Sequence, residues 1–265
     1  MYDYHVHSTY SDGTFLEWMV EAAADAGLDG VGFADHCNVT PTESARTFRR
    51  EMGFNLDLTY ERRREAIEQL DEAYSLAVFD AVEVDYEPDH EEPIRSFLAE
   101  AGFDYAIGSV HDLDGVNVHV RDYFGDLSES RRAALVDRYF DKLVALAESE
   151  LFEIAAHPDL IERNPHLRGF ATTDHYERAA AAFADSRTAV EINAGRVLDE
   201  YGALHPTETF LDTLLAHDVS VTLGTDSHEP DVIAPRRDVL VETAEEHGIA
   251  PTAVHGETAV TTGSD

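Results

Sequence analysis

The chain alternates short apolar runs with longer stretches in which apolar residues recur every three or four positions. The short runs are typical of buried strands, and the longer stretches are typical of helices that turn one face toward a core. Seven strands are predicted, at Tyr2–Val6, Val31–Ala34, Phe79–Val84, Tyr105–Val110, Phe152–Ala156, Thr188–Ile192 and Val219–Leu223. Seven helices are predicted between and after them, at Thr14–Ala26, Leu58–Ala77, Glu91–Ala101, Ser128–Glu150, His175–Ala184, Thr207–Ala216 and Arg237–His247.

This regular alternation of strand and helix predicts an α/β fold around a parallel sheet. Seven such units in 265 residues favour a distorted, TIM-like (β/α)7 barrel. A doubly wound open sheet is the alternative, but no glycine-rich G-x-G-x-x-G loop follows the first strand. Because no linker, repeat or low-complexity tract interrupts the pattern, residues 1–265 are expected to form a single domain.

Three local features refine the expected helix boundaries and connections. Thr14 followed by Glu17 predicts a capping box at the first helix, and Ser128 predicts an N-cap in a weaker form. The stretch from His36 to Tyr60 is predicted to be the longest irregular connection, and it is a candidate lid or substrate loop.

The composition is strongly acidic, with 54 Asp and Glu residues against 19 Lys and Arg, a formal charge of −35. Such a charge argues against binding to long nucleic acids or anionic membranes, which requires a basic surface. The acidic residues are spread along the chain and Lys142 is the only lysine, a composition that indicates a salt-rich, halophilic cytoplasm. Cys37 is the only cysteine, so no internal disulfide forms, and no apolar run is long enough to span a membrane. We therefore expect a cytoplasmic protein.

Histidines and carboxylates follow nearly every predicted strand. His5 and His7 end the first strand, where the two-residue period of a strand points both side chains the same way. The carboxyl ends of parallel barrel strands meet at one mouth, where active sites are built, so these residues are expected to converge. The other strand-end residues of this kind are His36, Glu83, His111, His157, Asp226 and His228. Imidazole and carboxylate ligands together suit Zn²⁺, Mn²⁺ or Fe²⁺ better than Mg²⁺ or Ca²⁺.

These motifs resemble a known family, the polymerase and histidinol phosphatase (PHP) superfamily. The motifs that carry the resemblance are His5-x-His7 with Ser11-Asp12-Gly13, Asp35-His36, Gly108-Ser109-Val110-His111, His157-Pro158-Asp159 and Asp226-x-His228. The chain is most similar to the histidinol-phosphate phosphatases of that superfamily, through Glu83-Val84-Asp85-Tyr86, Glu191-Ile192-Asn193 and Leu223-Gly224-Thr225-Asp226-Ser227-His228. The resemblance covers about residues 2–230.

The resemblance implies a distorted seven-stranded barrel that holds two to three divalent transition-metal ions in a site built for three. The implied ligands are His5, His7, Glu83 and Asp226 for one ion, Glu83 with His111 and His157 for a second, and Asp12, His36 and His228 for a third. It also implies a metal-dependent phosphomonoesterase that hydrolyses a small phosphorylated substrate, L-histidinol phosphate, to histidinol and phosphate in histidine biosynthesis. The candidate catalytic residues are Glu83, Asp226 and His228.

Phosphate also needs fixed donors, for which the fork of an arginine side chain is suited. Arg163 follows the fifth strand and Arg196 follows the sixth, so both are candidates at the expected end of the barrel. Arg168 and Arg236 are the alternatives.

Other functions remain open at this point. A nucleotide or 3′,5′-bisphosphate phosphatase, or a nuclease of the same superfamily, would use a similar site. An amidohydrolase-type barrel also opens with His-x-His, but many of these need a carboxylated lysine at a strand end, and Lys142 lies in a predicted helix. A degenerate barrel that binds a metal or a partner without catalysis is the non-enzymatic alternative.

Several residues near the candidate ligands have simpler interpretations. Asp12 can serve as a helix cap instead of a ligand, and Cys37 is expected to be a small buried residue. Asp35 and Asp159 are expected to orient neighbouring histidines or to cap turns, whereas Asn193 either lines the site or bonds to the backbone. Eight further histidines are predicted to be solvated, namely His90, His119, His166, His175, His205, His217, His247 and His255, and the run from Glu61 to Glu65 is predicted to be an exposed helix face.

Overall fold

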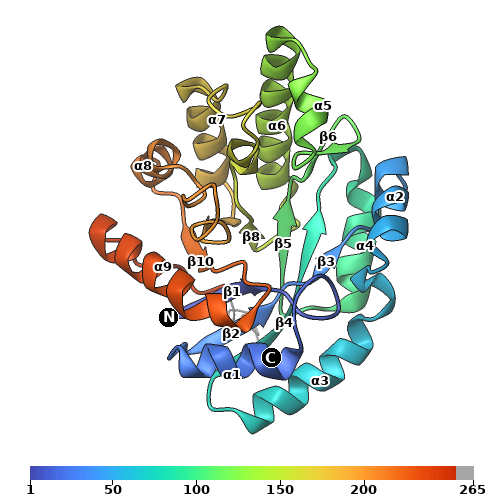
Figure 1. Cartoon of the computed structure of the whole chain (residues 1–265), viewed down its shortest axis with the longest axis vertical. Helices are drawn as coiled ribbons and strands as arrows, with labels where there is room; N and C mark the ends of the chain where they lie inside the picture. The colour runs from blue at the N-terminus through green and yellow to red at the C-terminus, as the bar shows by residue number, and fades with distance from the viewer. Residues whose placement is uncertain (255–265) are drawn as a thin grey trace, which may run out of the picture.

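Seven parallel strands form the centre of the molecule (Figure 1), in a computed structural model that describes residues 1–254. They pair in the order β1-β2-β4-β5-β8-β9-β10, so the seven strands lie side by side in the order in which they occur in the sequence. The bounds of these strands are β1 Tyr2–Val6, β2 Gly30–Phe33, β4 Ala77–Asp85, β5 Tyr105–Ser109, β8 Ile154–Ala155, β9 Ala189–Asn193 and β10 Val221–Gly224. A further short strand, β3 (His36–Cys37), pairs with β4 and places His36 opposite Glu83.

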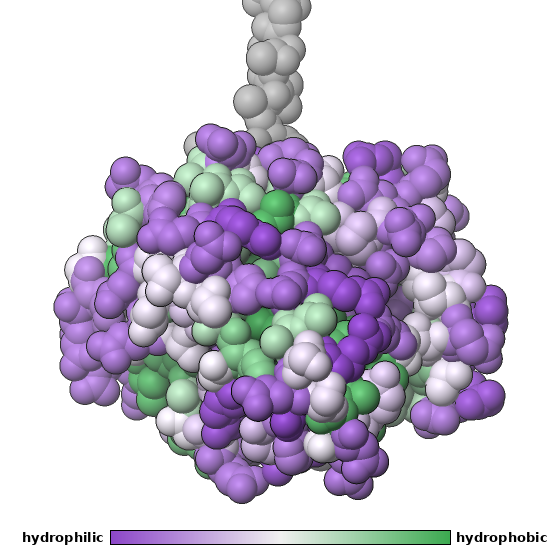
Figure 2. Space-filling model, turned by 90° about the horizontal axis from the view of Figure 1, so that it is seen from above, coloured by the Kyte–Doolittle hydropathy of each residue, from purple (hydrophilic) through white to green (hydrophobic). Residues whose placement is uncertain are grey.

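Helices surround the strands on the outside (Figure 1). Their bounds are α1 Leu16–Asp25, α2 Glu43–Met52, α3 Tyr60–Ala73, α4 Glu91–Ala101, α5 Arg121–Gly125, α6 Glu129–Ser149, α7 Thr173–Ala184, α8 Glu208–Ala216 and α9 Ile233–His247. Their apolar faces pack on the outward side chains of the strands, while hydrophilic residues cover most of the face seen in Figure 2. This division produces the periodic apolar pattern of the chain.

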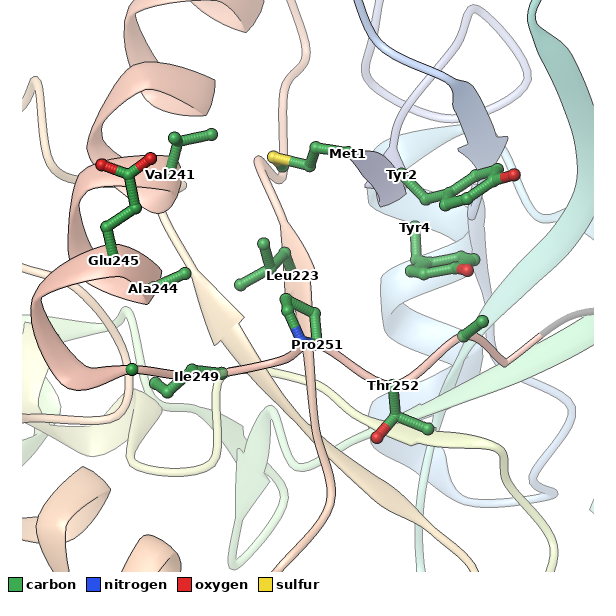
Figure 3. Close-up of a pocket in the computed structure, with 12 residues that line it drawn as sticks. Met1, Tyr2, Tyr4, Leu223, Val241, Ala244, Glu245, Ile249, Pro251 and Thr252 are labelled. Atoms are coloured by element: carbon green, nitrogen blue, oxygen red, sulfur yellow. The ribbon is translucent and has the colours of Figure 1, made fainter.

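The last strand returns to the first only at its carboxyl end. Val6 and Ser227 form a bridge there, where the Asp226 amide donates to the His5 carbonyl at 2.7 Å and the His7 amide donates to the Ser227 carbonyl at 2.9 Å. Below this point a cavity of about 450 Å³ lies between the two strands, α9 and the chain around residues 249–253 (Figure 3). The barrel is therefore nearly closed, and it is held most firmly where the strand-end histidines lie.

The seven predicted strands and seven predicted helices are confirmed, each to within a few residues. The helix at Glu91–Ala101 has the predicted bounds, and Ser128 caps α6 by accepting a hydrogen bond from the Arg131 amide. The distorted (β/α)7 barrel is the observed architecture, and the open doubly wound sheet is excluded.

The connection from His36 to Tyr60 is not irregular throughout, as the sequence pattern predicted. Besides β3 it contains α2 and a 3-10 turn at Leu56–Leu58. The helix was missed because its apolar face is short: Ala45, Phe48 and Met52 are its only apolar residues, and only Ala45 is buried. Its ends are nevertheless well marked, by the Thr42 side chain that accepts from the Ala45 amide and by Gly53 with φ 73°. The short antiparallel pair β6 (Asp112–Leu113) and β7 (Val116–Asn117) and the helix α5 were also not predicted.

The predicted capping box of Thr14 and Glu17 is wrong. The residue before α1 is Phe15, which makes no side-chain cap, and the Thr14 hydroxyl donates instead to the His228 carbonyl at 3.0 Å and to Glu229 Oε2 at 2.9 Å. A tertiary contact has therefore replaced the local one, and it ties the loop after β1 to the loop after β10.

Arg63 corrects the prediction that residues 61–65 form an exposed helix face. Its side chain is 0% exposed, and its guanidinium donates to Asp35 Oδ2 at 2.7 Å and to Asp80 Oδ1 at 2.6 Å, as well as to the Ala81 carbonyl. Arg63 thus neutralises two buried carboxylates between α3 and the strands. A run of five charged residues resembles a solvated surface, and only packing distinguishes its one buried member.

Replacing Arg63 with methionine is expected to lower the free energy of unfolding by about 3–5 kcal/mol, because Asp35 and Asp80 lose a buried partner. The neighbouring Arg62 is exposed, so Arg62→Met is the matched control, with an expected change within about 0.5 kcal/mol. Urea denaturation monitored by circular dichroism measures both. Equal stability of the two variants would contradict the assigned role of Arg63.

Candidate metal centre

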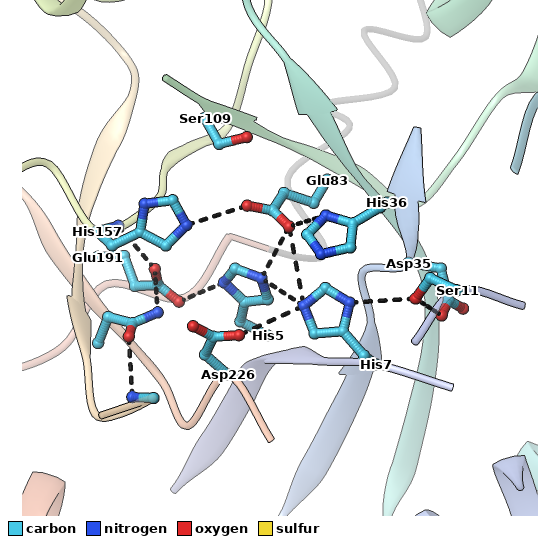
Figure 4. Close-up of polar contacts among 12 residues, drawn as sticks. His5, His7, Ser11, Asp35, His36, Glu83, Ser109, His157, Glu191 and Asp226 are labelled. Carbon is cyan, nitrogen blue, oxygen red and sulfur yellow. Dashed lines mark hydrogen bonds and ion pairs between the residues drawn. The ribbon is translucent and has the colours of Figure 1, made fainter. Parts of the chain in front are cut away.

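Glu83 lies at the centre of a histidine cluster at the mouth of the barrel (Figure 4). Its side chain is 1% exposed, and imidazole nitrogens approach both of its oxygens. Oε2 lies 2.7 Å from His36 Nδ1, and Oε1 lies 3.1 Å from His157 Nε2. The Nε2 atoms of His5 and His111 lie 3.5 and 3.6 Å from the carboxylate. One carboxylate therefore contacts imidazoles from four different strand ends.

All nine residues predicted as metal ligands lie together at this mouth. Among residues 1–254, three groups place their ligand atoms within 4.8 Å of one another: His5, His7 and Glu83; Glu83, His111 and His157; and His7, Asp12, His36 and His228. The ninth residue, Asp226, lies beside them, with Oδ1 3.4 Å from His7 Nε2. The grouping differs from the implied one in that His7 belongs to two groups and Asp226 to none of the three.

Hydrogen bonds on the far side of the rings orient His5 and His7 toward each other. The Nδ1 atom of His5 donates to Glu191 Oε1 at 2.7 Å. His7 Nδ1 lies 3.3 Å from the Ser11 hydroxyl, which itself donates to Asp35 Oδ1, so His7 is the donor in that contact. In neutral rings bonded in this way both Nε2 atoms would carry lone pairs, yet they lie only 3.1 Å apart. Two lone pairs at this distance require a shared proton or a cation.

The residues present fit a divalent transition metal. Glu83 Oε2 forms an ion pair with His36 Nδ1 but no hydrogen bond of normal geometry, and His157 Nδ1 is buried without a hydrogen-bond partner among the described residues. Buried polar atoms that lack hydrogen bonds are costly. The donor set mixes imidazole nitrogen with carboxylate oxygen, which suits Zn²⁺, Mn²⁺ or Fe²⁺. A carboxylate between two histidine groups is also the kind of ligand that can serve two ions at once.

The electrostatics of the cluster keep Glu83 ionised. Burial opposes its ionisation, but His36, His111 and His5 outweigh this effect and hold the pKa of the carboxyl group well below its usual range. Burial also opposes the charged form of His36 and so lowers its pKa, but the negative charges of Glu83 and Asp12 outweigh this effect and raise that pKa to about 10. Protons and metal ions therefore compete for the same ligand atoms.

The backbone at the mouth is shaped for close approach. A side chain at Gly224 would meet Glu191 Oε1 at 1.9 Å, and one at Gly195 would meet Asp226 Oδ2 at 2.3 Å. Asp226 itself adopts a left-handed conformation with φ 50°. Such positions concentrate at functional sites, where the surrounding structure enforces them.

Carboxylates behind the cluster orient several of the rings. Asp85 Oδ1 lies 2.6 Å from His111 Nδ1, and Asp35 acts on His7 through Ser11. Glu191 is a functional residue that the sequence interpretation did not assign, although its motif supported the resemblance. Its second oxygen accepts from the His157 amide at 3.0 Å. A carboxylate in the middle of an otherwise apolar strand was the signal that could have identified it.

The four candidate arginines take different places. Arg163 is buried, and its Nη2 lies 3.3 Å from Asn193 Oδ1 and 3.4 Å from Asp226 Oδ2. Arg196 lines the same cavity and pairs with Asp199 at 2.9 Å. The two alternatives do not line this cavity. Arg168 donates to the Glu162 carbonyl and lies over the Tyr201 ring, whereas Arg236 donates to the Thr225 and Asp226 carbonyls from behind.

The site opens into two adjoining cavities. One, of about 150 Å³, is lined by seven of the nine candidate ligands, all except His5 and His7, and is bordered by Phe48 and Phe54. The other, of about 300 Å³, shares His119, Arg163 and Arg196 with the first. A bound molecule can therefore reach the histidine cluster and the arginines at the same time.

Two of the histidines predicted to be solvated are buried. His175 takes part in a capping box with Thr172 at the start of α7, and His205 contacts Arg163. Cys37 is buried in the apolar core as expected. The Asn193 side chain accepts from the Gly195 amide, which is the backbone bond considered for it, and it also accepts from Arg163. His255 lies outside the described residues.

The PHP domain family model matches residues 3–195, more than half of the chain. The chain belongs to the PHP family. Asp226 and His228 lie beyond the matched residues, but the fold brings them to the same mouth.

Several proteins are similar to this PHP-family chain. A Deinococcus radiodurans protein named "Probable histidinol-phosphatase" is 25% identical over 88% of each chain. A histidinol phosphate phosphatase from Lactococcus lactis, solved in complex with zinc, L-histidinol and phosphate, is 21% identical over 96% of each chain, with a TM-score of 0.73. A candidate histidinol phosphatase from Listeria monocytogenes has a TM-score of 0.76 at 17% identity, over 90% of this chain and 99% of the other. The structural likenesses support the barrel fold.

The position of Lys142 and the lengths of the helices complete the description of this PHP-family chain. Lys142 lies on α6 and donates to Glu87 Oε2 at 2.6 Å and to the Asp112 carbonyl at 3.0 Å, so it does not bridge metals at a strand end. Within residues 1–254, no helix combines the length and apolar content that crossing a bilayer requires.

Addition of Zn²⁺ or Mn²⁺ to chelator-treated protein is expected to stabilise the fold, by about 2.7 kcal/mol at a metal concentration 100 times the dissociation constant. Glu83→Gln is expected to lose most of this effect, because the amide cannot bridge ions as an anion does. The exposed Glu92→Gln is the matched control and should respond like the unmodified protein. Thermal melts and elemental analysis measure both, and full metal content in Glu83→Gln would refute the central place of Glu83.

Proposed function

We propose that this protein is a metal-dependent phosphomonoesterase that hydrolyses L-histidinol phosphate to histidinol and phosphate. The observation that carries the proposal is the position of Arg163 beside Asp226, at the edge of the histidine cluster around Glu83. A guanidinium group next to a set of metal ligands is suited to bind an anion with several oxygen atoms, such as a phosphate group. The names of the related proteins support the same reaction class and suggest histidinol phosphate as the substrate.

Two to three divalent ions would be held by the nine residues of the cluster. The proposed ligands are His5, His7, Asp12, His36, Glu83, His111, His157, Asp226 and His228. When bound, such ions lower the pKa of water and neutralise charge on phosphoryl oxygens. They also let a chain with a formal charge of −35 accept an anionic substrate.

The arginines bind the phosphate in this proposal. Within residues 1–254, the Nε and Nη2 atoms of Arg163 have hydrogen-bond partners and its Nη1 atom has none, so Nη1 can donate to a phosphate oxygen. Arg196 lines both cavities and can add a second cationic contact. Fixed donors of this kind stabilise the charge that develops on the transferring phosphoryl group.

The leaving alcoholate needs a proton, and Asp226 and His228 are the candidate residues for this step. Burial opposes ionisation of Asp226, but His7, His5 and His228 outweigh it and hold the pKa of this carboxyl group well below its usual range. In this proposal His228 therefore donates the proton, and the Asp226 carboxylate faces it. Their side chains approach each other, with His228 Nδ1 3.8 Å from Asp226 Oδ1, beside the cavity that Arg163 borders. The adjoining cavity of about 300 Å³ can take the alcohol part of the substrate while the phosphate remains between the arginines. In this proposal the reaction takes place in the cavity of about 150 Å³, and the neighbouring cavity of about 300 Å³ binds the rest of the substrate.

The same proposal extends to the setting of the enzyme. A histidinol phosphatase acts in histidine biosynthesis, so we propose a cytoplasmic enzyme. The acidic composition supports a salt-rich cytoplasm as that setting.

Protein reconstituted with Zn²⁺ or Mn²⁺ is expected to release phosphate from L-histidinol phosphate faster than from mononucleotides or a 3′,5′-bisphosphate nucleoside. Arg163→Met is expected to lower kcat/KM by about 100-fold, because a fixed donor to the phosphoryl oxygens is lost. Arg178→Met removes an exposed arginine that pairs with Asp141 on the outside of the barrel, and it should leave kcat/KM unchanged. A metal-loaded, folded protein that turns over a nucleotide and not histidinol phosphate would reject this substrate.

Removing salt is expected to destabilise the fold, because repulsion among the surface carboxylates is then unscreened. The Debye length falls from about 10 Å at 0.1 M salt to about 3 Å at 1 M, so the midpoint of thermal unfolding should rise with KCl over this range. Circular dichroism melts at matched pH measure the effect. A midpoint that does not change with KCl would argue against a halophilic surface.

A further inference from the structure

A chain of buried hydrogen bonds leads away from the metal centre through Arg163. The Nε atom of Arg163 donates to His205 Nε2 at 2.9 Å, and His205 Nδ1 lies 2.6 Å from Asp159 Oδ1. Both His205 and Asp159 are 0% exposed. The second oxygen of Asp159 accepts from the Thr207 amide at 2.7 Å, so this carboxylate is itself held in place.

The contacts determine which protons His205 carries. An arginine has no acceptor, so His205 Nε2 must present a lone pair to Arg163. The proton of the ring then lies on Nδ1 and is donated to Asp159. Burial lowers the pKa of His205, and this favours the same neutral ring. Asp159 therefore selects the tautomer that Arg163 requires.

The ring of His205 has little freedom to turn. It stacks on Tyr201 with ring centroids 4.9 Å apart and planes 5° from parallel. Its backbone exchanges two hydrogen bonds with Asn193, at 2.6 and 3.0 Å. Since Asn193 Oδ1 also accepts from Arg163 Nη2, the guanidinium is held from two sides, and its Nη1 is left for the cavity.

We propose that Asp159 and His205 are positioning residues that aim Arg163 at the phosphate of the substrate. This inference rests on the proposed function, in which Arg163 binds phosphate. An unrestrained arginine would swing toward Asp226, whose Oδ2 already lies 3.4 Å from Nη2, and would neutralise that carboxylate instead of the substrate. Asp159 and His205 thus hold the Arg163 guanidinium between the Asp226 carboxylate and the phosphate of the substrate. Neither residue needs to touch the substrate.

Variants of His205 separate this role from a structural one. His205→Phe keeps the stacking on Tyr201 and removes the acceptor for Arg163, whereas His205→Gln retains an acceptor on a flexible side chain. The matched control is His175→Phe, because His175 is also buried, stacks on Phe140 at 4.8 Å and lies 2.8 Å from Asp137, but on the outer helix α7. Asp159→Asn removes the charge that holds the tautomer.

The measurement is the dissociation constant of inorganic phosphate for the metal-loaded protein by calorimetry, together with KM and kcat for L-histidinol phosphate. His205→Phe is expected to weaken phosphate binding by about tenfold or more and to raise KM, because a hydrogen bond to a charged group is lost. His205→Gln should recover most of the affinity, and the metal content of both variants should equal that of the unmodified protein. His175→Phe should bind phosphate normally, whatever it does to thermal stability.

A double-mutant cycle tests whether His205 acts through Arg163. If it does, adding His205→Phe to Arg163→Met should weaken phosphate binding no further, since the aimed group is already absent. Fully additive losses would overturn the proposal, and so would unchanged phosphate binding in His205→Phe. If His205→Phe does not fold, Asp159→Asn decides: weaker phosphate binding supports the proposal, and unchanged binding overturns it.

The same measurements distinguish this inference from the proposed function. Turnover and phosphate binding in the unmodified protein, with no change in the His205 variants, would reject the positioning role alone. Absence of turnover and of phosphate binding in the unmodified, metal-loaded protein would reject the phosphatase function, and the positioning role with it.

Discussion

A buried carboxylate surrounded by imidazoles is the constraint on which the mouth of this barrel depends. Glu83 lies at the end of β4 and is almost fully buried, so it needs positive charge close by. Parallel strands bring their carboxyl ends to one rim, and here each neighbouring strand contributes a histidine to that rim. The fold thus supplies the partners of Glu83 from residues far apart in the sequence. The short distance between His5 Nε2 and His7 Nε2 adds a second requirement, for a shared proton or a metal ion between the two rings.

A layer of carboxylates behind the cluster converts this crowding into a defined geometry. Glu191, Asp85 and Asp35 accept hydrogen bonds from His5, from His111 and, through Ser11, from His7. Each contact places the proton on one ring nitrogen and turns the other toward the cluster. The same arrangement recurs at His205, where Asp159 prepares the ring to accept from an arginine. In this acidic chain, a small set of buried and half-buried carboxylates organises the site, and most of the others are at least partly exposed.

How far the sequence could predict these features depends on the range of the interactions involved. Strand and helix positions follow from local periodicity, and the convergence of His5, His7 and His36 follows from where strands end. The helix α2 was missed because it has only three apolar residues, of which Ala45 alone is buried. The cap expected at Thr14 was replaced by a contact with residues 228 and 229. Arg63 looked solvated because its neighbours are, although its two carboxylate partners come from other elements.

The sequence by itself determined the alternation of seven strands and helices, the strand-end histidines and the family resemblance, because each of these depends on residue type and spacing along the chain. Only the tertiary structure decided which ligands share a group, that Arg163 and not Arg168 lies at the cavity, and that His205 is buried between Asp159 and Arg163. These outcomes depend on side chains that meet across elements, and no local pattern encodes which of several similar residues will be enclosed.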